Sequence, residues 1–458
     1  MSDGALELHI DNPDLDPANN SARTRLARLW LTLGVAALVA SGFYSILLVL
    51  SRTPAIQDMI PLLDFFHIAL VVHVDLSVLI WFLAFEGVLW SLLDNGRYLI
   101  MARVSFWLCA LGTIVIALSP FLGADQPLMN NYIPVLVHPV YFSGLLLFGA
   151  GFLILVIRGL LFSSRDEKQP DAFKFSLKAA AAAALISMIA LLTSYLDIPD
   201  SHEGESYFEV LFWGGGHILQ FTHTILLLLV WLWLASVTGS KVSVSSDTLK
   251  WLFAVAIMPV LAAFPIYAMY DVVSNEHRHT FTQLMRYGGL ASLPLMAIVI
   301  INIFSTSSVT DSLRPSRNAL LASIILFSAG GVLGFMIEGV NVVIPAHYHG
   351  SIVGVTLAFM GLTYYLLPKL GFRSVSGRAA RLQPWIYGGG QMMHILGLAW
   401  SGGYGVQRKT AGSAQGLENL PEIAGMAMMG LGGLIAIIGG FVFVVVTIKA
   451  MWPDKKQA

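Results

Sequence analysis

Twelve long apolar stretches constrain this chain more than any other feature. A helix needs about 20 apolar residues to cross the hydrocarbon core of a membrane, and in lipid its backbone must hydrogen-bond internally. Of the 458 residues, 56% are hydrophobic and only 12% are charged, whereas soluble domains are about 25% charged. The sequence therefore predicts an all-α integral membrane bundle of about twelve transmembrane helices. The stretches lie near residues 27–50, 62–93, 99–122, 133–161, 173–195, 207–238, 248–270, 281–305, 318–338, 346–367, 384–402 and 423–451.

The charged residues indicate how the chain is organised around the membrane. Residues 1–25 are polar and acidic and lack the basic start and apolar core of a signal peptide, so we expect a disordered cytoplasmic tail. Residues 26–452 would form one membrane domain, and 453–458 a second tail. Lys and Arg gather in alternate loops, and short basic loops stay in the cytoplasm, so both termini are expected there. The net charge of −1 gives no sign of a nucleic-acid partner.

Histidines inside apolar helices are candidate site residues, because a polar ring at membrane depth is costly unless it is bonded, paired or bound to metal. His347 and His349 are two residues apart, so on a helix they point about 200° apart with a rise of roughly 3 Å. They therefore cannot bind one iron from the same face. They could serve two centres, such as haems on opposite flanks of one helix. The alternative is a pair of interfacial histidines that cap the start of the helix.

Two further histidines lie at a similar depth. His73 and His217 each lie about a dozen residues into their stretch, and with His349 they enter from the non-cytoplasmic side. The three can therefore share one layer. His73 has apolar neighbours on both sides. A hydrogen bond to a facing helix is the simpler explanation for one such ring, but the depth shared with His349 favours a ligand.

These motifs resemble the catalytic subunit of the haem-copper oxidase superfamily, which includes cytochrome c oxidase subunit I and the nitric oxide reductase large subunit. The resemblance covers essentially all twelve stretches. Residues 346–370, with Ala-His-Tyr-His-Gly, resemble its two-haem helix. Residues 213–217, Trp-Gly-Gly-Gly-His, resemble the helix with the first ligand of a non-haem metal. Residues 132–139 resemble its fourth helix, and 393–409 its eleventh helix with a basic pair.

The resemblance implies two haems and a role for each motif residue. His73 and His349 would be the axial ligands of a low-spin haem. His347 would be the proximal ligand of a high-spin haem, and His217 would face its iron. Arg408 and Lys409, the basic pair, would neutralise haem propionates through charge-assisted hydrogen bonds. A solvated surface pair is the alternative for these two residues.

The sequence departs from the family pattern at the non-haem metal, whose identity as copper or iron stays open. Oxygen-reducing relatives have a tyrosine four residues after the first metal histidine, and here that place is Phe221, preceded by Gln220. The expected histidine pair near residues 266–268 is also missing. We expect His217, Gln220 and Tyr267 at the catalytic site. The candidates to replace the missing ligands form an oxygen-richer set that suits iron better than copper, and a site with no second metal is the other alternative. These candidates are Tyr267, Tyr270, Asp271, Glu276 and His277, with Asp271 our expected metal ligand.

The resemblance implies an oxidoreductase that reduces a diatomic gas. Splitting O2 uses the extra electron and proton of the tyrosine, whereas reduction of NO to N2O does not need them, so NO is slightly favoured. The carboxylate that NO reductases usually have four residues after the first metal histidine, His217, is also absent, since Phe221 stands there. A small subunit with haem c or copper would donate electrons, and the protein would lie in a bacterial inner membrane. The alternatives are a cytochrome c or quinol oxidase that reduces O2, and a non-catalytic haem subunit or sensor. A proton-coupled transporter would need broken helices and an inverted repeat, which the sequence does not show.

Overall fold

The computed structural model describes residues 22–50, 65–92, 98–161, 171–242, 244–305, 309–408 and 417–452. Eleven of its helices are long and apolar enough to cross a membrane. The remaining expected stretch, 384–402, lies in helix α15, Arg378–Gly403, which is not among these eleven helices and is richer in glycine and polar residues. The predicted all-α membrane bundle is confirmed. Of the two predicted tails, only residues 22–25 are described, and they begin the first helix.

The contacts divide the described chain into two compact units, which we describe separately. The first contains residues 22–229 and 244–296, and the second contains 230–242 and 297–452. The helices of the first unit are α1 (Ala22–Leu50), α3 (Phe65–Val74), α4 (Trp81–Leu92), α5 (Leu99–Leu118), α6 (Pro139–Leu161), α7 (Asp171–Asp197), α8 (Gly204–Val237, as far as residue 229), α9 (Ser246–Ile257), α10 (Ala263–Met269) and α11 (Asn275–Gly288). Those of the second are α13 (Arg314–Phe335), α14 (Val343–Lys369), α15 and α16 (Leu420–Met451), while α12 (Leu293–Ile303) begins in the first.

Short irregular segments interrupt the long helices of the first unit. The π-helix Asp75–Ile80 joins α3 to α4, so that residues 65–92 form one continuous helix. Single-turn π-helices occur frequently at functional sites, and this one begins two residues after His73. The 3₁₀ segment Met258–Ala262 joins α9 to α10, where Pro259 lacks the N–H of a regular turn. Two more 3₁₀ segments, Ser119–Leu122 and Gly289–Ser292, follow α5 and α11.

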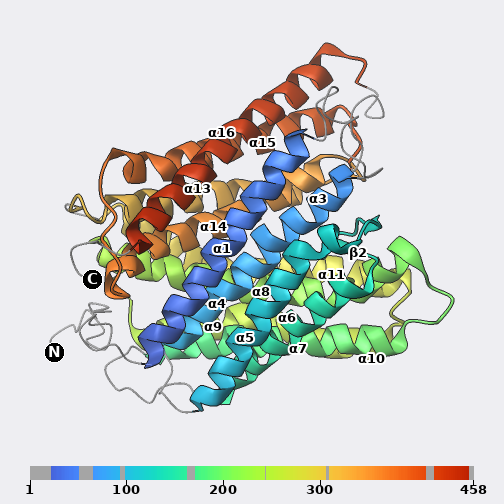
Figure 1. Ribbon diagram of the computed structural model, residues 1–458, viewed down its shortest axis with the longest axis horizontal. Helices are drawn as coiled ribbons and strands as arrows, with labels where there is room; N and C mark the ends of the chain where they lie inside the picture. The colour runs from blue at the N-terminus through green and yellow to red at the C-terminus, as the bar shows by residue number, and fades with distance from the viewer. Residues whose placement is uncertain are drawn as a thin grey trace. The chain divides into compact units, whose positions relative to one another are not determined.

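The fourth stretch begins later than its apolar composition predicts. Residues 133–138 are not helical, because β1 (Pro127–Leu128) and β2 (Val135–Leu136) pair as a two-stranded antiparallel hairpin. Helix α6 starts at Pro139, a residue well suited to a first helical turn because its missing N–H would have no partner there. The hairpin lies at one end of α5 and α6 (Figure 1) and carries Tyr132 in its loop.

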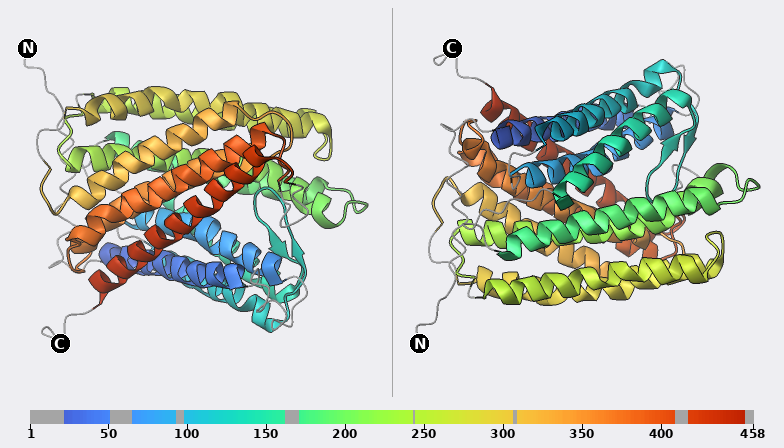
Figure 2. Two further views of the ribbon diagram at one scale, coloured as in Figure 1. Left: turned by 90° about the horizontal axis from the view of Figure 1, so that it is seen from above. Right: turned by 90° about the horizontal axis from the view of Figure 1, so that it is seen from below.

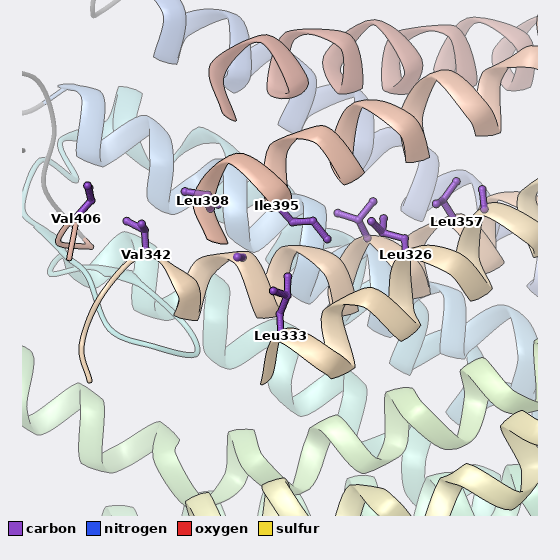
Figure 3. Close-up of a cluster of buried hydrophobic side chains, with 10 residues drawn as sticks. Leu326, Leu333, Val342, Leu357, Ile395, Leu398 and Val406 are labelled. Atoms are coloured by element: carbon purple, nitrogen blue, oxygen red, sulfur yellow. The ribbon is translucent and has the colours of Figure 1, made fainter. Parts of the chain in front are cut away.

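In the second unit, helices approach closely through glycines. Helices α15 and α16 run side by side (Figures 1 and 2), and a Cβ on Gly397 would lie 2.5 Å from the carbonyl oxygen of Gly425. Helices α13 and α14 meet in the same way, since a Cβ on Gly350 would lie 2.6 Å from the Cα of Gly330. Small residues at such crossings are typical of membrane helices. Figure 3 shows the buried aliphatic side chains that α13, α14 and α15 share.

Candidate functional site

His217 lies on α8 at the end of three consecutive glycines, and aromatic side chains approach it through them. A Cβ on Gly216 would overlap the ring of Tyr132, and one on Gly214 would overlap the hydroxyl of Tyr267. The absence of side chains at these positions therefore allows two tyrosines to reach α8. The His217 ring itself is 4% exposed.

The hydrogen bonds of His217 determine which ring nitrogen carries the proton. Its Nδ1 lies 2.7 Å from the carbonyl oxygen of Trp213 and 2.7 Å from the hydroxyl oxygen of Tyr132. A carbonyl oxygen only accepts, so Nδ1 must carry the proton and donate it. Nε2 then keeps its lone pair, as a metal ligand requires.

Tyr132 is held beside His217 by the hairpin loop. The side-chain oxygen of Asn130 accepts hydrogen bonds from the backbone N–H groups of Tyr132 and Ile133, each at 2.9 Å. Asn131, next in the loop, bonds to the carboxylate of Glu209 on α8. Burial, and to a smaller extent the charge of Glu209, raise the pKa of Tyr132 well above its usual value. The phenol therefore stays neutral at physiological pH.

The other two expected catalytic residues, Gln220 and Tyr267, lie on α8 and α10. Gln220 is half-buried one turn further along α8, and Phe221 is buried in a cluster with Val260 and Phe281. An apolar ring thus occupies the place of the tyrosine. The hydroxyl of Tyr267 is already engaged, because it donates to the carbonyl of Ala190 at 3.0 Å and lies 2.8 Å from the Ser194 hydroxyl.

Asp271, the expected metal ligand, lies in the turn after α10. Its side chain is exposed, and Oδ1 accepts a hydrogen bond from the backbone N–H of Val273 at 3.0 Å. Within the described ranges, no group of three or more His, Cys, Asp or Glu side chains is arranged to hold a metal ion. Any metal beside His217 would therefore use fewer such protein ligands.

His347 and His349 leave α14 toward different helices of the second unit. Nδ1 of His347 lies 2.7 Å from the carbonyl oxygen of Gly330 on α13. The ring of His349 meets that of His394 on α15 edge to face, with centroids 4.9 Å apart. The side chains of His347 and His349 therefore point in different directions, as expected for residues two apart on a helix.

Nδ1 of His73 on α3 has three oxygen atoms within hydrogen-bonding distance. The Ser41 hydroxyl, the Ser41 carbonyl and the Ser45 hydroxyl lie 2.8, 3.0 and 3.0 Å from it. The Ser41 hydroxyl donates its own proton to the His73 carbonyl, so its oxygen accepts from the ring. The His73 proton is therefore on Nδ1, and Nε2 keeps the lone pair.

The expected basic pair is described only in part. Arg408 is half-buried, and its buried Nε atom has no hydrogen-bond partner in the part of the chain that the structure describes. Lys409 lies outside the described residues. An unsatisfied guanidinium nitrogen of this kind is suited to an anionic group.

Comparison with known proteins decides the family. The sequence profile for cytochrome c and quinol oxidase polypeptide I matches residues 25–442. The chain belongs to this family. An uncharacterised protein of Rickettsia prowazekii is 31% identical, with 95% of this chain and 97% of the relative covered. An uncharacterised protein of Aquifex aeolicus is 29% identical, with 78% and 88% covered.

A solved haem-copper terminal oxidase dimer shares the fold. Its TM-score with this chain is 0.67 at 14% sequence identity, and the match covers 95% of this chain and 85% of that one. The resemblance to haem-copper oxidase subunit I is thus confirmed, and with it a multi-pass membrane protein. Membership supports a respiratory oxidoreductase, in a family that generally binds haems and a non-haem metal.

Several residues of this haem-copper oxidase homologue fit the haems of the family. At His73 and His347 the Nδ1–H donates to a main-chain carbonyl, which is the usual outer hydrogen bond of a ligating histidine. This bond orients the ring and leaves Nε2 for iron. The unsatisfied Nε of Arg408 fits a haem propionate. His394 has the same bond, to the carbonyl of Met429 at 2.9 Å, although the sequence indicated no ligand there.

Two polar pairs inside the helical bundle were not predicted from the sequence. Nδ1 of His223 on α8 lies 3.0 Å from Oε1 of Glu86 on α4, and the Tyr141 hydroxyl donates to Oδ2 of Asp75 at 2.6 Å. Glu86 is a carboxylate in an otherwise apolar helix, and His223 lies six residues after His217 on α8. The rule that polar residues inside a membrane pair with one another could have joined them.

Proposed function

We propose that this chain is the catalytic subunit of a respiratory gas reductase. His73 and His349 would hold a low-spin haem, His347 a high-spin haem, and His217 would face the second iron. The observation that best supports this proposal is the shared arrangement at His73, His347 and His217. Each donates Nδ1–H to a main-chain carbonyl and keeps the Nε2 lone pair for metal.

The chain's own residues would orient the cofactors and manage protons. When bound, the haems supply the electrons and an open iron position for a diatomic gas. Arg408, with Lys409, would neutralise the propionates, and Gln220 and Tyr267 would border the gas site. Glu86 and His223 would hold a proton between α4 and α8. A small subunit with haem c or copper would donate the electrons, with both termini cytoplasmic in a bacterial inner membrane.

We propose NO as the favoured substrate. Reduction of two NO molecules to N2O and water consumes two electrons and two protons, and needs no side-chain radical. Phe221 is 3% exposed and packs in an apolar cluster, so it can neither donate an electron readily nor bind a metal. The position four residues after His217 therefore lacks the tyrosine of oxygen reductases, and it also lacks the carboxylate usual in NO reductases, so it favours NO only by weakening the case for O2.

Turnover of both gases by the purified full-length protein tests this proposal. We expect N2O production from NO with an artificial electron donor, and a loss of at least about 100-fold in His217→Ala, because even residues that only support a metal ligand cost roughly 10- to 100-fold when replaced. His279→Ala, an exposed histidine on α11, is the control and should keep full activity. Two bound haems without turnover of either gas would indicate a non-catalytic haem subunit or sensor.

Oxygen reduction is the second candidate, favoured by one contact. The Tyr132 hydroxyl lies 2.7 Å from Nδ1 of His217, so a phenol reaches this histidine from the hairpin rather than from α8. If O2 is the substrate and Tyr132 donates to it, Tyr132→Phe should reduce O2 turnover by about 100-fold or more, as is typical for loss of a proton-transfer group. NO turnover, measured on the same sample, should change little.

A further inference from the structure

His394 on α15 is fixed by α16 at one ring nitrogen. Its Nδ1 lies 2.9 Å from the carbonyl oxygen of Met429, and because a carbonyl oxygen only accepts, Nδ1 carries the proton and donates it. A glycine on α16 makes this approach possible, since a Cβ on Gly433 would lie only 3.3 Å from the same nitrogen. The orientation of the His394 ring is therefore set by a neighbouring helix.

The ring of His349 on α14 lies against this fixed ring. The two imidazoles meet edge to face, with centroids 4.9 Å apart and planes at 71° to each other. Both side chains are half-buried, and three helices of the second unit, α14, α15 and α16, converge at this contact. Aromatic rings prefer such an edge-to-face arrangement to a face-to-face sandwich. The contact therefore restricts rotation of the His349 ring.

The same contact excludes one role for His394. The two axial ligands of a haem lie on opposite faces of the porphyrin, which separates their rings. Two imidazoles that touch edge to face therefore cannot bind the same iron from opposite faces. His394 is thus a neighbour of the expected ligand His349 and not its counterpart across the iron.

We propose that His394 is a positioning residue for the low-spin haem, because its ring, held by the Met429 carbonyl, sets the orientation of the His349 imidazole. This inference rests on the proposed function for the haem at His349. Residues around a ligating histidine orient its ring and tune the metal, and the reduction potential of a haem responds to such changes around its axial ligands. Helix α16, which carries no proposed ligand, thereby helps to set the potential at which the low-spin haem passes electrons.

EPR spectroscopy of the oxidised full-length protein, with a redox titration of the same sample, tests the inference. The g values of a low-spin ferric haem depend on the angle between its two axial imidazole planes, so His394→Ala should move the largest g value while both haems stay bound. We expect the relative stability of the ferric and ferrous haem to change about tenfold, as for other residues that support a metal ligand, which is a shift of about 59 mV for a one-electron couple. Leu396→Ala, two residues further along α15 and exposed, should keep the wild-type signal and potential.

Two further variants distinguish a fixed ring from simple packing. His394→Phe keeps an aromatic ring beside His349 but has no N–H for the Met429 carbonyl, so its low-spin signal should also change. Gly433→Ala leaves both histidines in place and crowds Nδ1 of His394, so it should change the signal even if His394→Ala fails to assemble. Gly430→Ala on the same helix would meet nothing within 4 Å and should match the wild type.

The outcomes separate this inference from the proposed function. Wild-type g values and potential in His394→Ala would overturn the inference, as would a wild-type signal in both His394→Phe and Gly433→Ala. Turnover is scored separately. Gas reduction with a low-spin signal that is insensitive to all three variants overturns only this inference, whereas a sensitive signal without turnover of either gas overturns only the proposed function.

Discussion

Oε1 of Glu86 and Nδ1 of His223 lie 3.0 Å apart, and the glutamate side chain has no exposed surface. The two residues come from α4, whose other side chains are almost all apolar, and from α8. Oε2 of Glu86 has no hydrogen-bond partner within the described part of the chain. A carboxyl group and an imidazole joined in this way can share a proton at membrane depth, and each reduces the cost of burying the other.

Removing one partner of this pair should destabilise the protein more than replacing both partners with apolar side chains. We expect His223→Leu to cost about 3 to 5 kcal/mol, because it leaves the fully buried Glu86 unpaired, and Glu86→Leu to cost less, because His223 is only half-buried. The double variant should unfold at nearly the wild-type temperature, since two apolar side chains leave nothing unsatisfied. Thermal unfolding in detergent measures all three. Additive losses in the double variant would contradict the pairing.

The second prediction concerns the orientation of His347. A Cβ on Gly334 would lie 2.7 Å from Nδ1 of His347, so Gly334→Ala should push the ring from its bond with the Gly330 carbonyl. We expect the share of CO-binding haem to fall about tenfold, as for other second-layer changes at metal sites. Gly331→Ala is the matched control, because a Cβ there would meet nothing within 4 Å. Equal CO difference spectra in the two variants would show that His347 is not the proximal ligand.

The third prediction tests whether His73 is an axial ligand of the low-spin haem. His73→Ala should reduce the haem content from two to about one per chain and remove the six-coordinate signal, because one axial imidazole holds such a haem poorly. His67→Ala, on the same helix six residues earlier, should keep both haems. Pyridine haemochrome quantitation measures the content. Two haems retained in His73→Ala would mean that another residue ligates the iron.

The fourth prediction tests the glycine crossing of α15 and α16. A Cβ on Gly397 would lie 2.5 Å from both the Gly425 carbonyl oxygen and the Met429 nitrogen. Gly397→Ala must therefore separate the helices, and we expect a loss of about 1 to 3 kcal/mol, the usual cost of overpacking. Gly430→Ala on α16 would meet nothing within 4 Å and should unfold like the wild type. A wild-type unfolding temperature in Gly397→Ala would show that the crossing tolerates a wider spacing.

The apolar stretches alone were enough to predict the membrane helices, because the free energy of a helix in lipid depends mainly on the residues within it. The error at residues 133–138 arose where apolar residues belong to a hairpin and not to a helix. The opposite directions of His347 and His349 also followed from the sequence, since the period of a helix is a local property.

The partners of each buried polar group depended on the packing of helices that are distant in sequence. Tyr132 contacts His217, which is 85 residues later in the sequence, and Glu86 contacts His223, which is 137 residues later. His277 stands out only because its ring is buried without a hydrogen bond, which no local pattern reveals. The depth and rotation of each helix set these contacts, and both result from close packing among many side chains at once. The sequence therefore specified the helices and the directions of their side chains, while the partners followed from how the helices pack.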